Sequence, residues 1–230
     1  MSYLIDPNLE KIKKFVEFAS DRDVSNRELI LEMMREIPEP DSVRDLRHGP
    51  FQSEEEAVSA MIEAGKAISE MNFVTAVFGN LSVRLNDVIY ITATGAKLTD
   101  LAGSIVKCRL DGETLNGLTP SSEMPAHLKI LNGTSSAVVL HAHPFFTVAY
   151  SMIKGLNNTV FGVPVVGGDI GGGETGLVHT VPPVLKDFNI TVVHGHGVFA
   201  VDSFDFNSPL TSVFKLEKLC RNKFVAEYLS

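Results

Sequence analysis

The segment VVLHAHP, residues 138–144, decides how this chain folds. Three apolar residues lead into two histidines spaced i, i+2 and then into a proline, which is typical of a buried strand that ends where a helix begins. The segment ITVVHGHGVFAV, residues 190–201, predicts a second buried strand that carries His194 and His196. Residues i and i+2 of a strand point to one face of a sheet, so each segment is predicted to present two imidazoles side by side.

The four histidines of these segments allow two interpretations. Three or four imidazoles that converge on one point hold a divalent cation well, and zinc with an open coordination position is the typical case. The alternative is a set of core histidines bonded to the backbone, because a buried neutral imidazole needs hydrogen-bond partners.

Outward from these strands, β-rich and helical segments alternate, which predicts a layered α/β domain with a mixed sheet. Asn86-Asp87 separates two short apolar runs within residues 80–92 and predicts a hairpin, hence an antiparallel pair of strands. Within residues 1–52, apolar residues such as Ile12 and Phe15 recur at helical spacing among lysines and glutamates, and a linker follows. We therefore expect a helical N-terminal extension over residues 1–52 and a main domain over residues 53–230.

Composition excludes several classes of protein. The 230 residues carry 28 acidic and 20 basic side chains, and a net charge of -8 argues against nucleic acid or an anionic membrane as the partner. The two cysteines, Cys108 and Cys220, have no C-x-x-C context, so we expect no disulfide or thiolate zinc site and a reducing, cytoplasmic location. No secretory signal is expected, because residues 1–10 show no basic region followed by an apolar run. No membrane-spanning segment is expected either, because no uncharged apolar run reaches about 20 residues.

Residues 121–131, SSEMPAHLKIL, predict a helix capped by Ser121 or Ser122. Glu123 lies at the helix start and is the carboxylate companion that a histidine site would need, and His127, one turn later, could orient it. The alternative is an acid that only complements the helix dipole.

Two further stretches have the composition of anion-binding turns. FGNLS contains Gly79, Asn80 and Ser82 before an expected strand, and ATG contains Thr94 and Gly95 after one. Backbone N–H groups and small polar side chains in tight turns can hold a phosphate without lysine or arginine. Ordinary turns are the alternative for both.

Taken together, five motifs resemble the class II aldolase/adducin family in order and spacing. They are GNLSVR (79–84), ITATG (91–95), DGETLNGLTPSSEMPAH (111–127), VVLHAHP (138–144) and VVHGHGVFAV (192–201). The resemblance covers about residues 56–225 and implies a three-layer α/β/α fold with a mixed, mostly antiparallel central sheet, to which the N-terminal helical extension is added.

The resemblance also implies roles for individual residues. His141, His143 and His196 match metal ligands of the family, whereas His194 falls at a variable position. Glu123 matches an acid that can ligate the resting metal and acts as the general acid/base. The residues that match substrate-phosphate positions are Asn80, Thr94, Gly95, Ser121 and Ser122.

The implied activity is that of a metal-dependent aldolase, closest in motif to the enzyme that acts on L-fuculose 1-phosphate. It would cleave a ketose 1-phosphate into dihydroxyacetone phosphate and an aldehyde, with Zn²⁺ as the cofactor and Mn²⁺ or Co²⁺ as alternatives. Sugar-phosphate epimerisation, dehydration and decarboxylation are alternatives in the same family, as is a non-catalytic adducin-like interaction module. The family implies a homo-oligomer, expected to be a tetramer, with active sites between subunits.

One segment departs from the family pattern. Members commonly take an acid such as tyrosine from the segment after the HAHP motif of a neighbouring subunit, but residues 160–185 contain no tyrosine. Tyr228, near the end of the chain, is a candidate substitute.

Overall fold

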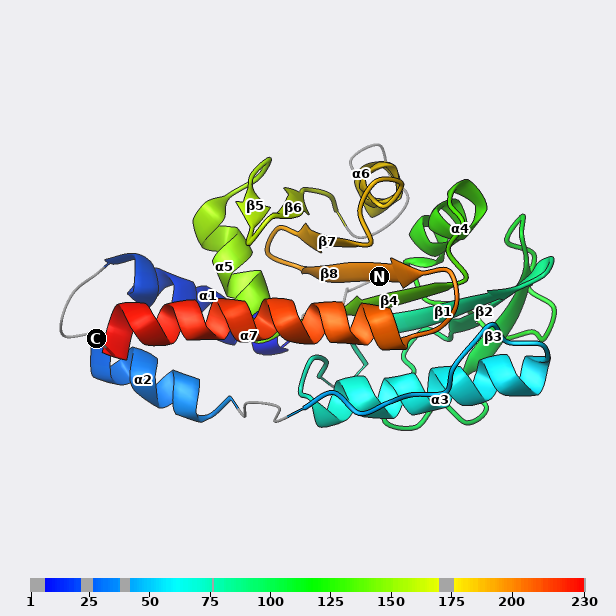
Figure 1. The fold of residues 1–230 in the computed structure, drawn as a ribbon, viewed down its shortest axis with the longest axis horizontal. Coiled ribbons are helices and arrows are strands. Elements are labelled where there is room, and N and C mark those ends of the chain that lie inside the picture. The colour runs from blue at the N-terminus through cyan, green and yellow to red at the C-terminus, as the bar shows by residue number, and fades with distance from the viewer. Residues whose placement is uncertain (1–6, 22–26, 38–41, 76, 170–175, 230) are drawn as a thin grey trace.

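A computed structural model describes residues 7–21, 27–37, 42–75, 77–169 and 176–229 (Figure 1). Its helices are α1 (Pro7–Asp21), α2 (Arg27–Arg35), α3 (Glu54–Glu70), α4 (Met124–Gly133), α5 (Phe145–Lys154), α6 (Leu177–Val184) and α7 (Asn207–Leu229). Its strands are β1 (Asn80–Leu85), β2 (Val88–Thr92), β3 (Ile105–Arg109), β4 (Val138–Ala142), β5 (Thr159–Val160), β6 (Val163–Val166), β7 (Ile190–Val193) and β8 (Gly197–Asp202).

The strands form one sheet in the order β3-β2-β1-β4-β8-β7-β6-β5. β6 pairs with β7 in parallel and the other neighbouring pairs are antiparallel, so the mixed, mostly antiparallel sheet is confirmed. The expected hairpin joins β1 to β2, and Asn86 adopts a φ of 56° in its two-residue turn. Asparagine tolerates this left-handed conformation better than most residues, which explains its place there.

Alternation along β4 sorts its side chains between the two faces of the sheet. Val138, Leu140 and Ala142 lie in the large core cluster with α1, α3, α5 and α7. Val139 lies in a second cluster with α4 and α6. These helices cover opposite faces, which confirms the three-layer α/β/α architecture (Figure 1). His141 follows Val139 by two residues and therefore faces the side of α4.

The first two helices pack onto the main domain through aromatic and aliphatic side chains. Phe15 is fully buried, and its ring contacts Phe145, Phe146 and Phe224 edge to face at centroid distances of 5.4, 5.9 and 4.9 Å. Arrangements of this kind contribute about 0.5–1.5 kcal/mol per pair beyond area burial. The extension thus shares the core of α5 and α7.

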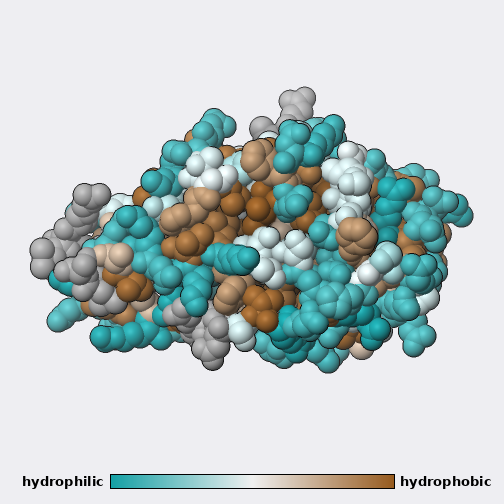
Figure 2. All heavy atoms as spheres, in the orientation of Figure 1, coloured by the Kyte–Doolittle hydropathy of each residue, from teal (hydrophilic) through white to brown (hydrophobic). Residues whose placement is uncertain are grey.

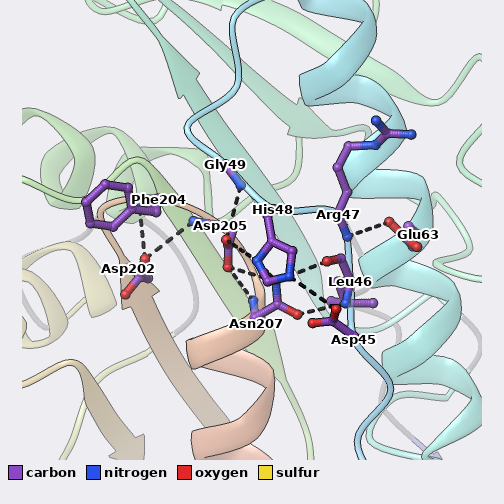
Figure 3. A network of polar contacts seen from close by, with 10 residues as sticks. All are labelled: Asp45, Leu46, Arg47, His48, Gly49, Glu63, Asp202, Phe204, Asp205 and Asn207. Carbon is purple, nitrogen blue, oxygen red and sulfur yellow. Dashed lines mark hydrogen bonds and ion pairs between the residues drawn. The ribbon is translucent and has the colours of Figure 1, made fainter.

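Residues 42–52 have no helix or strand, yet polar contacts hold them against the start of α7 (Figure 3). The Asn207 Oδ1 accepts from the Leu46 N–H at 2.7 Å, and its Nδ2 donates to the Leu46 carbonyl at 3.2 Å. The Gly49 N–H donates to Asp205 at 3.1 Å. A Cβ at Gly49 would lie 2.0 Å from the Phe204 carbonyl oxygen, so this close approach requires glycine. The sequence predicts a linker here, but residues 42–52 are bound to the main domain along the start of α7 and form a strap.

Hydrophilic side chains cover most of the face seen in Figure 2, and apolar side chains gather in its middle, beside α7. None of the described helices has the length and hydropathy needed to cross a bilayer.

Candidate metal centre

Three histidines from two parts of the chain converge near the C-terminal end of β4. His141 lies in β4, His143 follows directly after β4, and His196 lies between β7 and β8. One nitrogen of each lies within 4.8 Å of the others. His141 and His143 are buried, whereas His196 is partly exposed and gives the centre its access to solvent.

His194 and His196 do not share a strand, and this corrects the sequence interpretation. The single strand expected over residues 190–201 is a hairpin: Val193 pairs with Gly197, and residues 194–196 form the turn. Gly195 adopts a φ of 64°, the left-handed conformation that a three-residue hairpin needs and that glycine supplies at low cost. The turn brings His196 to the centre, while His194 is outside the cluster of three histidines.

Backbone contacts fix which nitrogen His141 offers. Its Nδ1 lies 3.0 Å from the Val198 carbonyl oxygen, which can only accept, so Nδ1 carries the hydrogen. Burial holds the pKa of His141 well below its ordinary value and keeps the ring neutral. Nε2 therefore presents a lone pair to the centre. Hydrogen-bonding the second ring nitrogen in this way is the usual means of orienting a metal-binding histidine.

The spacing of the donor atoms suits a small divalent cation. The His141 and His143 Nε2 atoms are 2.9 Å apart, and the Glu123 oxygens lie 2.9 Å from His196 Nε2 and 3.3 Å from His141 Nε2. Ligands at 2.0–2.1 Å from a tetrahedral zinc ion are separated by about 3.4 Å. Three imidazoles and a carboxylate thus fit zinc in both chemistry and spacing, and they also suit manganese or cobalt.

Glu123 lies at the N-cap position of α4, where the sequence predicted a serine. Its side chain makes no capping hydrogen bond; Ser121 Oγ instead accepts from the Glu123 N–H at 3.3 Å. The Glu123 carboxylate is 6% exposed and faces the histidines. Burial opposes its ionisation, but the imidazoles of His141 and His196 and a hydrogen bond from Asn80 outweigh burial and hold its pKa below the ordinary value.

Asn80 in β1 and His127 in α4 connect Glu123 to the sheet through hydrogen bonds. Asn80 Nδ2 lies 2.6 Å from Glu123 Oε2, and Asn80 Oδ1 lies 2.5 Å from His127 Nε2. His127 Nδ1 in turn lies 2.7 Å from Ser82 Oγ. The sequence placed His127 on the face of Glu123, but the structure shows that His127 reaches it through Asn80.

The other phosphate-binding candidates lie together near the start of α4. The Thr94 N–H donates to Thr119 at 2.9 Å, and the Ser121 N–H donates to Thr92 at 3.0 Å. These bonds set the exposed turn of Thr94 and Gly95 beside Ser121 and Ser122. The candidates are thus neighbours, and Asn80 alone among them is buried against Glu123. The side chain of Tyr228 lies outside the described part of the structure.

A buried carboxylate that the sequence analysis missed supports the helix after His143. Glu217 accepts from the N–H groups of Phe146 and Thr147 at 2.8 and 2.7 Å, and from the Thr147 hydroxyl at 2.7 Å. These contacts cap α5 at the end nearest the centre. The signal was available, because Glu217 is the one acid among the apolar residues Val213, Cys220 and Phe224 at helical spacing.

The fold and the donor atoms define the class of protein: a three-layer α/β/α protein with a histidine cluster suited to a divalent cation. Residues 59–223 match the family described as Class II Aldolase and Adducin N-terminal domain, and the chain belongs to this family.

Two curated relatives from the comparison match part of this chain. L-fuculose phosphate aldolase from Methanococcus maripaludis is 33% identical over 98 residues, which cover 42% of this chain and 54% of the relative. Methylthioribulose-1-phosphate dehydratase from Pseudoalteromonas translucida is 33% identical over 108 residues, which cover 45% of this chain and 50% of the relative. The chain spans about half the length of the curated relatives it matches.

Solved structures share the fold at lower identity. YgbL from Klebsiella pneumoniae, for which aldolase, epimerase and decarboxylase are the candidate activities, has a TM-score of 0.67 at 24% identity, covering 76% of this chain and 91% of that protein. L-fuculose-1-phosphate aldolase from Thermus thermophilus has a TM-score of 0.59 at 23% identity, covering 72% and 89%.

Proposed function

We propose that this protein is a metal-dependent aldolase that cleaves a ketose 1-phosphate, similar to L-fuculose 1-phosphate, into dihydroxyacetone phosphate and an aldehyde. The observation that carries the proposal is the position of Glu123. Its buried carboxylate lies on the edge of a three-histidine centre, where a base and a cation can act on the same substrate. The aldolase and dehydratase relatives both act on sugar phosphates by name, which supports the substrate class.

His141, His143 and His196 would hold the cation, with Glu123 as a fourth ligand in the resting protein. We propose zinc, with manganese or cobalt as alternatives. When bound, a divalent cation acts as a Lewis acid that stabilises negative charge developing on substrate oxygens.

Glu123 is proposed as the general acid/base. A pKa held below the ordinary value keeps its carboxylate ionised, so it can accept a proton from the carbon next to the substrate carbonyl in the direction of aldol addition. In cleavage the hydroxyl of the carbon that becomes the aldehyde loses its proton as the bond between the two carbons breaks. The carbon next to the carbonyl takes up one proton from the protonated form of Glu123, so the net reaction moves one proton from oxygen to carbon. Partly exposed His196 beside it leaves the substrate a path to this atom.

The substrate phosphate is proposed to bind Thr94, Gly95, Ser121 and Ser122. Asn80, in β1, is proposed to contribute a further hydrogen bond to it. Backbone N–H groups and hydroxyls supply the hydrogen bonds, which suits a chain with net charge -8. Anchoring the phosphate positions the reacting carbons and removes much of the entropic cost of reaction.

The experiment combines metal analysis with product detection. Purified protein is assayed for bound zinc, manganese and cobalt, then for release of dihydroxyacetone phosphate from a panel of ketose 1-phosphates. Glu123→Gln should lower kcat by about 10²- to 10⁴-fold. Glu113→Gln, an exposed glutamate paired with Arg109, is the matched control and should not change it.

Each outcome has a distinct meaning. Protein without any bound divalent cation would contradict the metal-dependent proposal and favour an adducin-like interaction module. Bound cation without triose phosphate would favour the epimerase, dehydratase or decarboxylase alternative. Full activity in Glu123→Gln would show that another residue is the base.

We also propose a homo-oligomer, a tetramer by the family resemblance. The support is a group of large exposed apolar side chains: Ile153 near the end of α5, Leu156 in the turn that follows, and Phe161 in the turn between β5 and β6. Exposed apolar groups of this kind favour protein contacts. Light scattering coupled to size exclusion measures the mass, and a mass near 25 kDa would contradict this proposal.

A further inference from the structure

A chain of buried polar side chains runs from the middle of the sheet to the proposed base. Ser82 Oγ lies 2.7 Å from His127 Nδ1, and His127 Nε2 lies 2.5 Å from Asn80 Oδ1. Asn80 Nδ2 lies 2.6 Å from Glu123 Oε2. Ser82 and His127 are fully buried, and Asn80 is 6% exposed. β1 supplies Ser82 and Asn80 at alternate positions, and α4 supplies His127 one turn after Glu123.

All three hydrogen bonds in this row of side chains must run in the same direction, from Ser82 to Glu123. An ionised carboxylate only accepts, so the atom of Asn80 facing Glu123 is its NH₂ group and the atom facing His127 is its carbonyl oxygen. That oxygen accepts, so His127 Nε2 carries a hydrogen. The ring of His127 is fully buried, and burial disfavours the charged imidazolium, so the ring is neutral. Nδ1 is therefore an acceptor, and the Ser82 hydroxyl donates to it.

Packing alone does not account for this arrangement. Buried polar groups cost free energy unless every partner is present, and apolar side chains would fill the same space between β1 and α4. A glutamate at the N-cap position is also free to turn toward the N–H groups of its own helix, which are its ordinary electrostatic partners. Here the donor on Oε2 holds the carboxylate away from them and leaves Oε1 against His196.

We propose that Ser82, His127 and Asn80 form a one-way hydrogen-bond relay that sets the orientation of the Glu123 carboxylate, with His127 as the positioning residue. Asn80 has a second amide hydrogen that Glu123 does not use, so its proposed phosphate contact and the relay are compatible. The relay rests on the proposed function for its kinetic readout, and it has a second readout that does not.

The kinetic test compares two substitutions of His127 in the full-length protein. His127→Leu removes the donor to Asn80, and His127→Gln keeps an N–H near the position of Nε2. We expect His127→Leu to lower kcat or zinc affinity by about 10- to 100-fold, the usual effect of losing a partner that orients a ligand, with KM unchanged within about twofold. His127→Gln should recover most of the loss.

Thr191→Val is the matched control, because Thr191 is fully buried and its hydroxyl donates to a backbone carbonyl outside the relay. It should leave kcat, KM and zinc affinity unchanged. Zinc affinity is measured by competition with a chromophoric chelator. A His127→Leu protein with kcat and zinc affinity equal to the control would overturn the relay.

The second readout is the tautomer of His127 in the unsubstituted protein. It does not depend on enzymatic activity or on the stability of His127→Leu. Nitrogen-15 spectra of zinc-free protein labelled at histidine report the tautomer of each ring, and His127→Gln identifies the His127 signals. The relay requires hydrogen on Nε2 and a bare Nδ1. Hydrogen on Nδ1 would overturn it even if the aldolase reaction were demonstrated, and the expected tautomer in a protein without aldolase activity would show that only the proposed function had failed.

Discussion

The Glu123 carboxylate and the His196 imidazole meet across 73 residues of sequence, with Oε1 2.9 Å from Nε2. The contact joins the start of α4 to the turn between β7 and β8. Neither residue could reach the centre alone: Glu123 needs the position of α4 on the sheet, and His196 needs the left-handed turn at Gly195.

The turn between β7 and β8 separates two histidines that look equivalent in the sequence. His196→Ala should abolish stoichiometric zinc binding, because it removes one of three converging nitrogens. His194→Ala should leave the stoichiometry at its original value. Atomic emission on dialysed protein measures both, and equal loss in the two variants would contradict the assignment of His196 alone.

His127 should make the protein sensitive to acid. Its pKa is about 4 when folded and about 6.5 when unfolded, because burial disfavours the imidazolium. The unfolded chain therefore binds more protons between these values, and the free energy of unfolding rises with pH across that window. The contribution is complete above pH 6.5 and lost as the pH falls toward 4, by about 3 kcal/mol in all.

Urea unfolding of zinc-free protein from pH 4 to 7 measures this dependence. His127→Gln cannot titrate, so its free energy of unfolding should vary less steeply than that of the unsubstituted protein. Other buried groups such as His141 titrate in both proteins and cancel in the difference. Parallel curves would show that His127 does not titrate in this range.

Phe15 should anchor the N-terminal extension. Phe15→Ala empties a fully buried site among three aromatic rings, so we expect it to lower the free energy of unfolding by about 3–5 kcal/mol. Phe204→Ala is the control of equal chemistry, because Phe204 is 56% exposed, and it should cost less than about 1 kcal/mol. Similar losses in both would mean that α1 does not share the core.

Asn207 should hold the strap of residues 42–52. Asn207→Ala removes the acceptor of the Leu46 N–H and a donor to its carbonyl, so hydrogen exchange at the Leu46 amide should accelerate. Asn222→Ala, on the exposed side of α7, should leave that amide protected. Unchanged exchange in Asn207→Ala would show that the strap is held by other contacts (Figure 3).

Much of this architecture could be predicted from local pattern. The apolar run before His141 identified β4, Asn86-Asp87 identified the β1–β2 hairpin, and Pro144 marked the passage to α5. The errors were also local in origin. The pattern of residues 190–201 predicts one strand through Gly195, but a single left-handed glycine is enough to make a turn.

The cap of α4 shows a second limit. Ser121 and Ser122 have a strong preference for the N-cap position, but Glu123 occupies it. Propensity describes a helix by itself, and here the contacts of Glu123 with the sheet outweigh it. The same limit hid Glu217, whose partners on α5 lie 70 and 71 residues away.

By itself, the sequence determined the layered α/β class, the donor residues and their chemistry, because strand periodicity and side-chain type are local properties. The family resemblance already distinguished His196 from His194, and the tertiary structure supplied the cause, the left-handed turn at Gly195. Only the tertiary structure decided that Asn80 bridges His127 to Glu123. Those choices depend on backbone turns and on contacts between distant segments, which arise only when the sheet and α4 pack together.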